Sequence, residues 1–106
     1  MSERLQNLLA ELRRRLEALY GPRLLRLMLY GSQARGDAEP GSDIDVLVVL
    51  EGPVQPGEEI ERTLDHVASL SLENNVVICC VFISGDKFER EQSPLMLNVR
   101  REGVPV

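Results

Sequence analysis

The sequence lacks several features, and each absence narrows what the protein can do. Its only cysteines, Cys79 and Cys80, are adjacent within an apolar run, so on a strand they would face opposite ways. A structural disulfide is therefore not expected, and two reduced, buried thiols are the simpler interpretation. The chain has one histidine and no tryptophan, and none of its residues have the spacing of zinc ligands.

Long hydrophobic runs and an excess of positive charge are also missing. The longest apolar run, residues 76–83, is far shorter than a membrane span. The first nine residues, MSERLQNLL, are amphipathic and lack the apolar core of a signal peptide, so we expect a cytoplasmic protein with no membrane contact. The net charge of −5 disfavours strong binding to free nucleic acid, because such binders are usually basic.

The 106 residues are long enough for one domain, residues 1–106, with a single modest core. Apolar spacing, turn residues and helix caps predict the order helix, strand, helical turn, strand, helix, strand, helical turn, helix. The expected ranges are 3–20, 24–30, 32–35, 43–50, 58–73, 76–83, 86–91 and 94–101. Because the first two strands are too close in sequence for a long crossover, we expect a small mixed sheet backed by helices, an α/β (α+β) fold.

Three helical features carry specific expectations. In the helix at 58–73, the apolar spacing places Ile60, Leu64, Val67 and either Leu70 or Ser71 toward the core. The run Arg13 to Arg15 is either an ordinary solvated face or a patch that contacts phosphate, and solvation is favoured. His66 is expected to be a partly exposed helix residue without a catalytic role.

The stretch from Tyr30 to Leu50, YGSQARGDAEPGSDIDVLVVL, carries the chemistry. A strand runs into Gly31, and Ser32 begins a short helix whose free N–H groups and hydroxyl can bind phosphate. Asp43 and Asp45 alternate with Ile44, so on a strand both carboxylates project from one face about 7 Å apart. Close carboxylates repel unless a cation lies between them, and Mg²⁺, often bound together with nucleotide phosphates, is the natural one.

Gly31-Ser32, ten further residues and Asp43-Ile44-Asp45 form the GS-x10-D-x-D pattern, and the chain here resembles the DNA polymerase β-like nucleotidyltransferase superfamily. The fuller run GSQARG…GSDIDVLVV is similar to the minimal nucleotidyltransferases of that superfamily. The pattern itself covers residues 31–45, and the order of expected elements extends the resemblance over essentially the whole chain. The resemblance implies the nucleotidyltransferase fold.

The resemblance also assigns roles by position. It implies that Gly31 and Ser32 bind the nucleotide and that Asp43 and Asp45 are the catalytic ligands of Mg²⁺ or Mn²⁺. Arg35 matches the family's arginine position, and its place one turn after Ser32 lets it reach the same phosphates or brace the acidic loop. Active members carry a third carboxylate on the next strand, whereas residues 76–83 contain neither Asp nor Glu. We expect Cys80 or Ile78 to occupy that position, with Glu73 and Asp86 on the surface.

The resemblance implies a Mg²⁺-dependent enzyme that transfers a nucleoside monophosphate, AMP from ATP, to a hydroxyl group. It further implies pairing with a small helical HEPN protein as the antitoxin of a toxin–antitoxin pair, with the partner supplying part of the site. The alternative is a catalytically impaired module of the same fold that binds a nucleotide or a partner, because the third carboxylate is missing. The side chains of the third strand that face the aspartates discriminate between the two.

Overall fold

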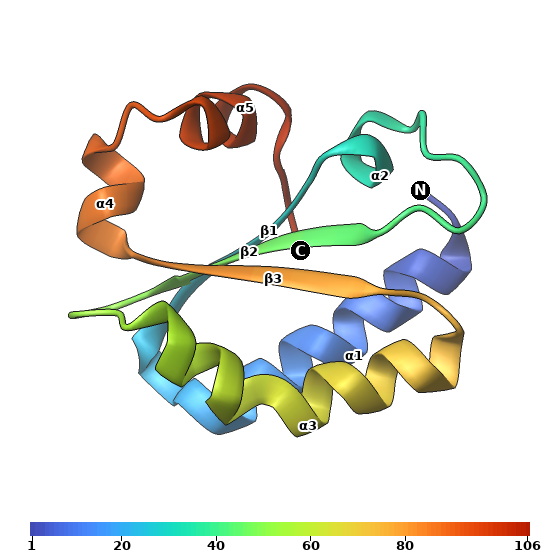
Figure 1. Cartoon of the computed structure of the whole chain (residues 1–106), viewed down its shortest axis with the longest axis horizontal. Coiled ribbons are helices and arrows are strands. Elements are labelled where there is room, and N and C mark those ends of the chain that lie inside the picture. The colour runs from blue at the N-terminus through green and yellow to red at the C-terminus, as the bar shows by residue number, and fades with distance from the viewer.

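The computed structural model describes residues 1–106, and its centre is a four-stranded sheet with strand order β3-β2-β1-β4 (Figure 1). β1 pairs antiparallel with β2 and with β4, whereas β2 and β3 are parallel. The predicted mixed sheet is therefore confirmed. The strand bounds are Leu24–Tyr30 for β1, Ile44–Leu50 for β2, Ile78–Ser84 for β3 and Val104–Pro105 for β4.

The helices begin and end close to the predicted limits, at signals that the sequence displays. Ser2 accepts a hydrogen bond from the backbone N–H of Leu5, and Ser93 does the same for Met96, so both are N-caps. None of the helices is long and apolar enough to cross a bilayer. The bounds are Glu3–Tyr20 for α1, Ser32–Arg35 for α2, Pro56–Asn74 for α3, Gly85–Arg90 for α4 and Pro94–Glu102 for α5, and a 3₁₀ turn, Gly21–Arg23, follows α1.

The two faces of the sheet are covered unequally, and this positions the site. In Figure 1, α1 and α3 lie under one face, while α4 and α5 lie over part of the other. Alternate residues of β2, from Ile44 through Val46 and Val48, join the larger core under α1 and α3, whereas Leu47 and Val49 join the smaller core beneath α4 and α5. Asp45 is two residues before Leu47, so its side chain lies on the same, less covered face of the sheet.

The inward face of α3 differs from the prediction. Ile60 and Leu64 are 51% and 55% exposed, while Glu59 is only 2% exposed and Thr63 is buried beside it. Leu70 is buried and Val67 packs against the core, as predicted. The rotation of the helix follows from the polar partners available to Glu59, which outweigh the burial of two aliphatic side chains.

The carboxylate of Glu59 is held by three neighbours. The Tyr20 hydroxyl donates to it at 2.7 Å, Arg62 donates at 3.1 Å, and Arg23 forms an ion pair at 3.5 Å. Burial acts to raise the pKa of Glu59, but the hydrogen bond from Tyr20 and the two arginines outweigh burial, so the pKa lies below its usual value. This cluster fastens the end of α1 to the start of α3.

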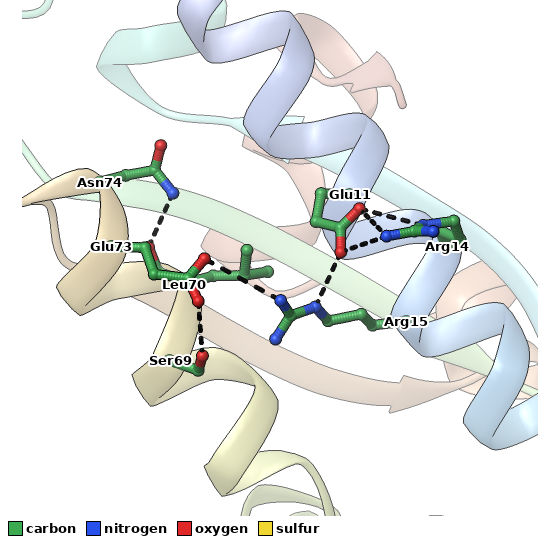
Figure 2. A network of polar contacts seen from close by, with 7 residues as sticks. All are labelled: Glu11, Arg14, Arg15, Ser69, Leu70, Glu73 and Asn74. Atoms are coloured by element: carbon green, nitrogen blue, oxygen red, sulfur yellow. Dashed lines mark hydrogen bonds and ion pairs between the residues drawn. The ribbon is translucent and has the colours of Figure 1, made fainter.

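The arginine run of α1 is engaged with carboxylates. Figure 2 shows the ion pairs of Arg14 and Arg15 with Glu11. Arg15 also lies 4.0 Å from the Glu73 carboxylate of α3. Arg13 pairs with the Glu17 carboxylate at 2.6 Å. These contacts agree with an ordinary polar helix face that also links α1 to α3, and surface pairs of this kind contribute little each.

Replacing Tyr20 with Phe removes the hydroxyl donor from buried Glu59. We expect the free energy of unfolding to fall by about 1–2 kcal/mol at neutral pH. Because the folded pKa of Glu59 is lowered, its stabilising contribution is present above the unfolded pKa of 4.5 and is lost as the pH falls through the folded pKa. Urea unfolding of wild type and variant should therefore show a difference in unfolding free energy that narrows as the pH is lowered below 4.5. A gap that stays constant or widens would contradict this account.

Candidate functional site

The structure brings Asp43 and Asp45 together on the less covered face of the sheet. Asp45 is the second residue of β2 and lies opposite Tyr30 of β1 and Cys79 of β3. Asp43 precedes the strand, which begins at Ile44 and not at Asp43 as predicted. Asp43 Oδ2 lies 3.7 Å from Cys79 Sγ, so both carboxylates face the same row of side chains.

Gly31 lies close to the carboxylate of Asp45. It has φ of 76°, and a Cβ added there would lie 2.7 Å from Asp45 Oδ2. A side chain at this position would therefore be strained and would also displace the carboxylate. Glycine is required here by both the backbone and the neighbouring aspartate.

Ser32 follows Gly31 and begins α2, which is only four residues long. The Gly31 carbonyl accepts hydrogen bonds from the N–H groups of Ala34 and Arg35, so the turn is closed from within. The N–H groups of Ser32 and Gln33, at the start of the helix, have no carbonyl within it to bond. Gln33 also donates to the Ser42 carbonyl at 3.4 Å, which links the turn to the loop before Asp43.

Arg35 binds two carboxylates in this structure. Its Nε donates to Asp37 Oδ2 at 3.1 Å, and its Nη1 donates to Glu102 Oε1 of α5 at 3.1 Å. These bonds raise the pKa of Arg35 above its usual value, Asp37 contributing most. Of the two roles expected for Arg35, the structure shows it bracing the acidic loop, here against α5.

The pKa values of three side chains at the aspartate pair are raised. Burial raises the pKa of Asp45, and the charge of Asp43 raises it further. Burial likewise raises the pKa of Tyr30, with Asp45 as the next cause, and burial followed by the charge of Asp43 raises that of Cys79. A positive charge between the two aspartates would relieve this repulsion.

The residues at the pair fit a divalent cation only in partnership with other ligands. No group of three His, Cys, Asp or Glu side chains is arranged to hold a metal ion by itself. Two carboxylates from one strand, however, match the way Mg²⁺ binds in nucleotide sites, where phosphate oxygens and water complete its shell. The donor set therefore suits a cation that arrives with a nucleotide.

The expectation that Cys80 or Ile78 occupies the position of the third carboxylate is wrong, because Cys79 does. Ile78 and Cys80 pair with Ile44 and Val46 and pack against the core on the opposite face. Burial raises the pKa of Cys80 to about 12, so it remains a protonated thiol. Side chains of β3 alternate between the two faces of the sheet, and the register with β2 places Cys79 on the face of Asp45.

The two carboxylates that flank β3 are engaged elsewhere. Glu73 lies on α3, where it accepts from Ser69 and approaches Arg15, and Asp86 pairs with Arg90 on α4. Both are exposed, as expected. Sequence reasoning missed Tyr30 and Cys79 as neighbours of the pair. The closeness of β1 and β2 in the sequence indicates antiparallel pairing, but residues 31–43 do not fix the register that sets Tyr30 opposite Asp45.

Comparison with known proteins agrees with this geometry. A model of the nucleotidyltransferase domain family matches residues 9–96. The curated "Putative protein adenylyltransferase MJ0604" of Methanocaldococcus jannaschii is 34% identical over 76 residues, which cover 72% of this chain and 70% of that protein. The chain belongs to the nucleotidyltransferase domain family.

Solved structures show the same fold. A protein described as a putative minimal nucleotidyltransferase is 27% identical, with a TM-score of 0.62 over 100% of this chain and 97% of that one. A toxin–antitoxin structure with AMP-PNP is 19% identical, with a TM-score of 0.64 over 93% of this chain and 69% of that one. The second likeness shows the fold alone.

Gly31→Ala and Gly36→Ala form a matched pair of variants. Both glycines have positive φ, but an added Cβ meets Asp45 only at Gly31 and meets nothing within 4 Å at Gly36. Gly36 is in the left-handed helical region, so we expect Gly36→Ala to lose about 1–2 kcal/mol of stability. Gly31, with ψ of −157°, lies in a backbone region essentially restricted to glycine, so we expect Gly31→Ala to lose more. Only Gly31→Ala should also weaken Mn²⁺-dependent binding of a non-hydrolysable ATP analogue, by about tenfold or more. Equal binding losses in calorimetry would contradict the role assigned to the Gly31–Asp45 contact.

Asp43→Asn relieves the repulsion with Asp45. We expect the metal-free protein to gain about 1 kcal/mol at neutral pH, or a melting temperature roughly 4–8 °C higher. The raised pKa of Asp45 means that its ionised form destabilises the fold, so the gain should fade as acid protonates Asp45, and it should shrink in high salt. Thermal melts measure both effects. A lower or unchanged melting temperature would show that Asp43 chiefly braces its loop.

Proposed function

We propose that this chain is a Mg²⁺-dependent nucleotidyltransferase that transfers AMP from ATP to a hydroxyl group. The observation that carries the proposal is the Asp43–Asp45 pair set against the Gly31–Ser32 turn, with Gly31 in contact with Asp45. The names of relatives support it, since one is named "Putative protein adenylyltransferase" and the structure of another contains AMP-PNP.

Each residue has a role in this mechanism. The N–H groups of Ser32 and Gln33, together with the Ser32 hydroxyl, bind phosphate oxygens at the turn. Asp43 and Asp45 would hold Mg²⁺, or Mn²⁺, whose bound charge offsets that of the phosphates and aligns them for attack. The acceptor hydroxyl oxygen bonds to the α-phosphorus as the bond to pyrophosphate breaks. Because β3 offers no carboxylate, the hydroxyl proton passes to solvent or to a group of the acceptor.

The acceptor in this proposal belongs to a partner protein. The chain matches a toxin–antitoxin structure over most of its length, and we propose that it serves as the antitoxin that adenylylates a helical, HEPN-type toxin. A partner would also supply surface that this small chain does not provide around the open site.

A second candidate function rests on Cys79. The row that faces the aspartates holds Cys79 in β3 and no third carboxylate, which favours a module that binds nucleotide or partner without transferring AMP. This alternative keeps the same roles for Gly31, Ser32, Asp43 and Asp45 in binding.

Incubation with ATP labelled at the α-phosphate, Mg²⁺ and the product of the neighbouring gene separates the two functions. The transferase predicts label on the partner, and a variant with Asn at both 43 and 45 should lose at least about 100-fold of the transfer. Parallel reactions with the other nucleoside triphosphates test the preference for ATP. Tight Mg²⁺-dependent ATP binding without label transfer would support the binding module, and unchanged binding in the double variant would reject the site.

A further inference from the structure

The two edges of the sheet, β3 and β4, differ in how well they are protected. β4 is only two residues long and contains Pro105, a residue that discourages further strand pairing. β3 is seven residues long, and it carries no charged residue, no proline and no bulge. It therefore lacks the features by which edge strands avoid pairing with another chain.

Two residues of β3 present free backbone groups at this edge. Because the Val77 carbonyl bonds to β2, the alternation of a strand directs the N–H and C=O groups of Cys80 and Phe82 away from β2. The N–H of Ile78 points the same way, but it donates to Ser71 Oγ of α3 at 3.3 Å. The centre of the edge thus offers alternating donors and acceptors, which a second copy in antiparallel orientation would complement.

Two exposed apolar side chains of α3, Ile60 and Leu64, lie beside the same edge. They share a helix face with Ser71, whose hydroxyl reaches β3, so this face turns toward the free edge and away from α1. The face is formed by residues 60, 64, 67, 68 and 71, and none of them is charged. A surface that paired with β3 would therefore also cover the two aliphatic side chains that α3 leaves about half exposed.

The position of Leu64 along the edge favours a second copy of the chain as the occupant. α3 and β3 run in opposite directions, as Figure 1 shows. From the contact of Ser71 with Ile78, seven helix residues and three strand residues each advance about 10 Å, so Leu64 is level with Val81. Val81 is the centre of β3, so a twofold axis there would pair the whole strand and bring the two Leu64 side chains together.

The spacing of the helices fits the same arrangement. α1 and α3 cover four strands, so each helix spans two strands, or about 10 Å. In a sheet continued across β3, α3 and its copy would be separated by this same spacing. Helices pack at about 8–10 Å, so the helix layer would continue together with the sheet. A single extended peptide at the edge would leave Ile60 and Leu64 without such a neighbour.

The charges at the two ends of β3 are complementary under this axis. Lys87 of α4 lies beside the last residues of β3, together with Glu91, whose carboxylate accepts from Ser93. At the other end of the strand, Asp43 approaches Cys79. Antiparallel pairing sets the last residues of one β3 against the first residues of the other, so Lys87 of each copy would approach the acidic end of its partner.

We propose that two copies of this chain associate through the free edges of β3, in antiparallel register about Val81, and form one continuous sheet. Cys80 of each copy then exchanges backbone hydrogen bonds with Phe82 of the other. The contact strip is about 23 Å long and two layers, about 20 Å, deep, which gives about 460 Å² on each copy and a weak, reversible dimer. This association does not depend on the proposed function.

Sedimentation velocity at increasing protein concentration tests the association. Wild type should pass from monomer to dimer between about 1 µM and about 500 µM. Leu64→Glu sets two like charges together at the axis, so it should weaken the dimer by at least about tenfold. Leu72→Glu is the matched control, because Leu72 lies on the same helix, 82% exposed and outside the face defined above. This control should dimerise like wild type.

Two further measurements locate the interface and its register. Amide hydrogen exchange of wild type should slow by at least about tenfold at Cys80 and Phe82 in the dimer. For the register, Val81→Cys is made in a chain that also carries Cys79→Ser and Cys80→Ala. Val81 would face its own copy with Cα atoms about 4.5 Å apart, a distance that a disulfide spans. Mild oxidation should link this variant into dimers, whereas Leu72→Cys in the same background should stay unlinked. Circular dichroism checks that each variant is folded.

A chain that stays monomeric at every concentration would overturn the proposal, as would equal dimerisation of Leu64→Glu and wild type. A dimer in which the amides of Cys80 and Phe82 exchange as fast as in the monomer would place the contact on another surface. Protection of these amides only when the product of the neighbouring gene is added would also overturn it, and would assign the edge of β3 to a partner protein.

Discussion

The candidate site depends on the close antiparallel pairing of β1 with β2. The register sets Tyr30 opposite Asp45, so the turn that follows β1 lies directly against the first residues of β2. Gly31 then comes so near Asp45 that a Cβ would meet its carboxylate oxygen. The Gly31–Ser32 turn and the aspartates are therefore placed by the paired strands β1 and β2, while α1 and α3 pack beneath the sheet (Figure 1).

The two neighbouring carboxylates, Asp43 and Asp45, dominate the electrostatics of the site. The raised pKa of Asp45 reflects burial and the neighbouring Asp43, a combination that disfavours two ionised carboxylates without a cation. Such strain is common at sites where a ligand relieves it. Cys79 occupies the facing position on β3, so that strand adds no third carboxylate beside the pair. The arrangement agrees with membership of the nucleotidyltransferase domain family.

Local patterns predicted most of the fold and the aspartate pair. Strand alternation placed Asp43 and Asp45 on one face, and the caps at Ser2 and Ser93 gave two helix starts. Contacts between residues far apart in the sequence could not be predicted from local patterns. The rotation of α3 depends on Tyr20, 39 residues before Glu59, and Arg35 pairs with Glu102, 67 residues away. Likewise, Cys79 and Cys80 are equivalent in the sequence until the β2–β3 register chooses between them.

The central claim is that a divalent cation and a nucleotide bind together between the aspartate pair and the Gly31 turn. Backbone amide spectra recorded with substoichiometric Mn²⁺ and a non-hydrolysable ATP analogue test it most directly, because the paramagnetic ion broadens nearby resonances. We predict that the amides of Gly31, Ser32, Asp45 and Cys79 broaden first, while those along the exposed side of α3 remain sharp. Broadening centred on other acidic surfaces, with these four amides unaffected, would contradict the account.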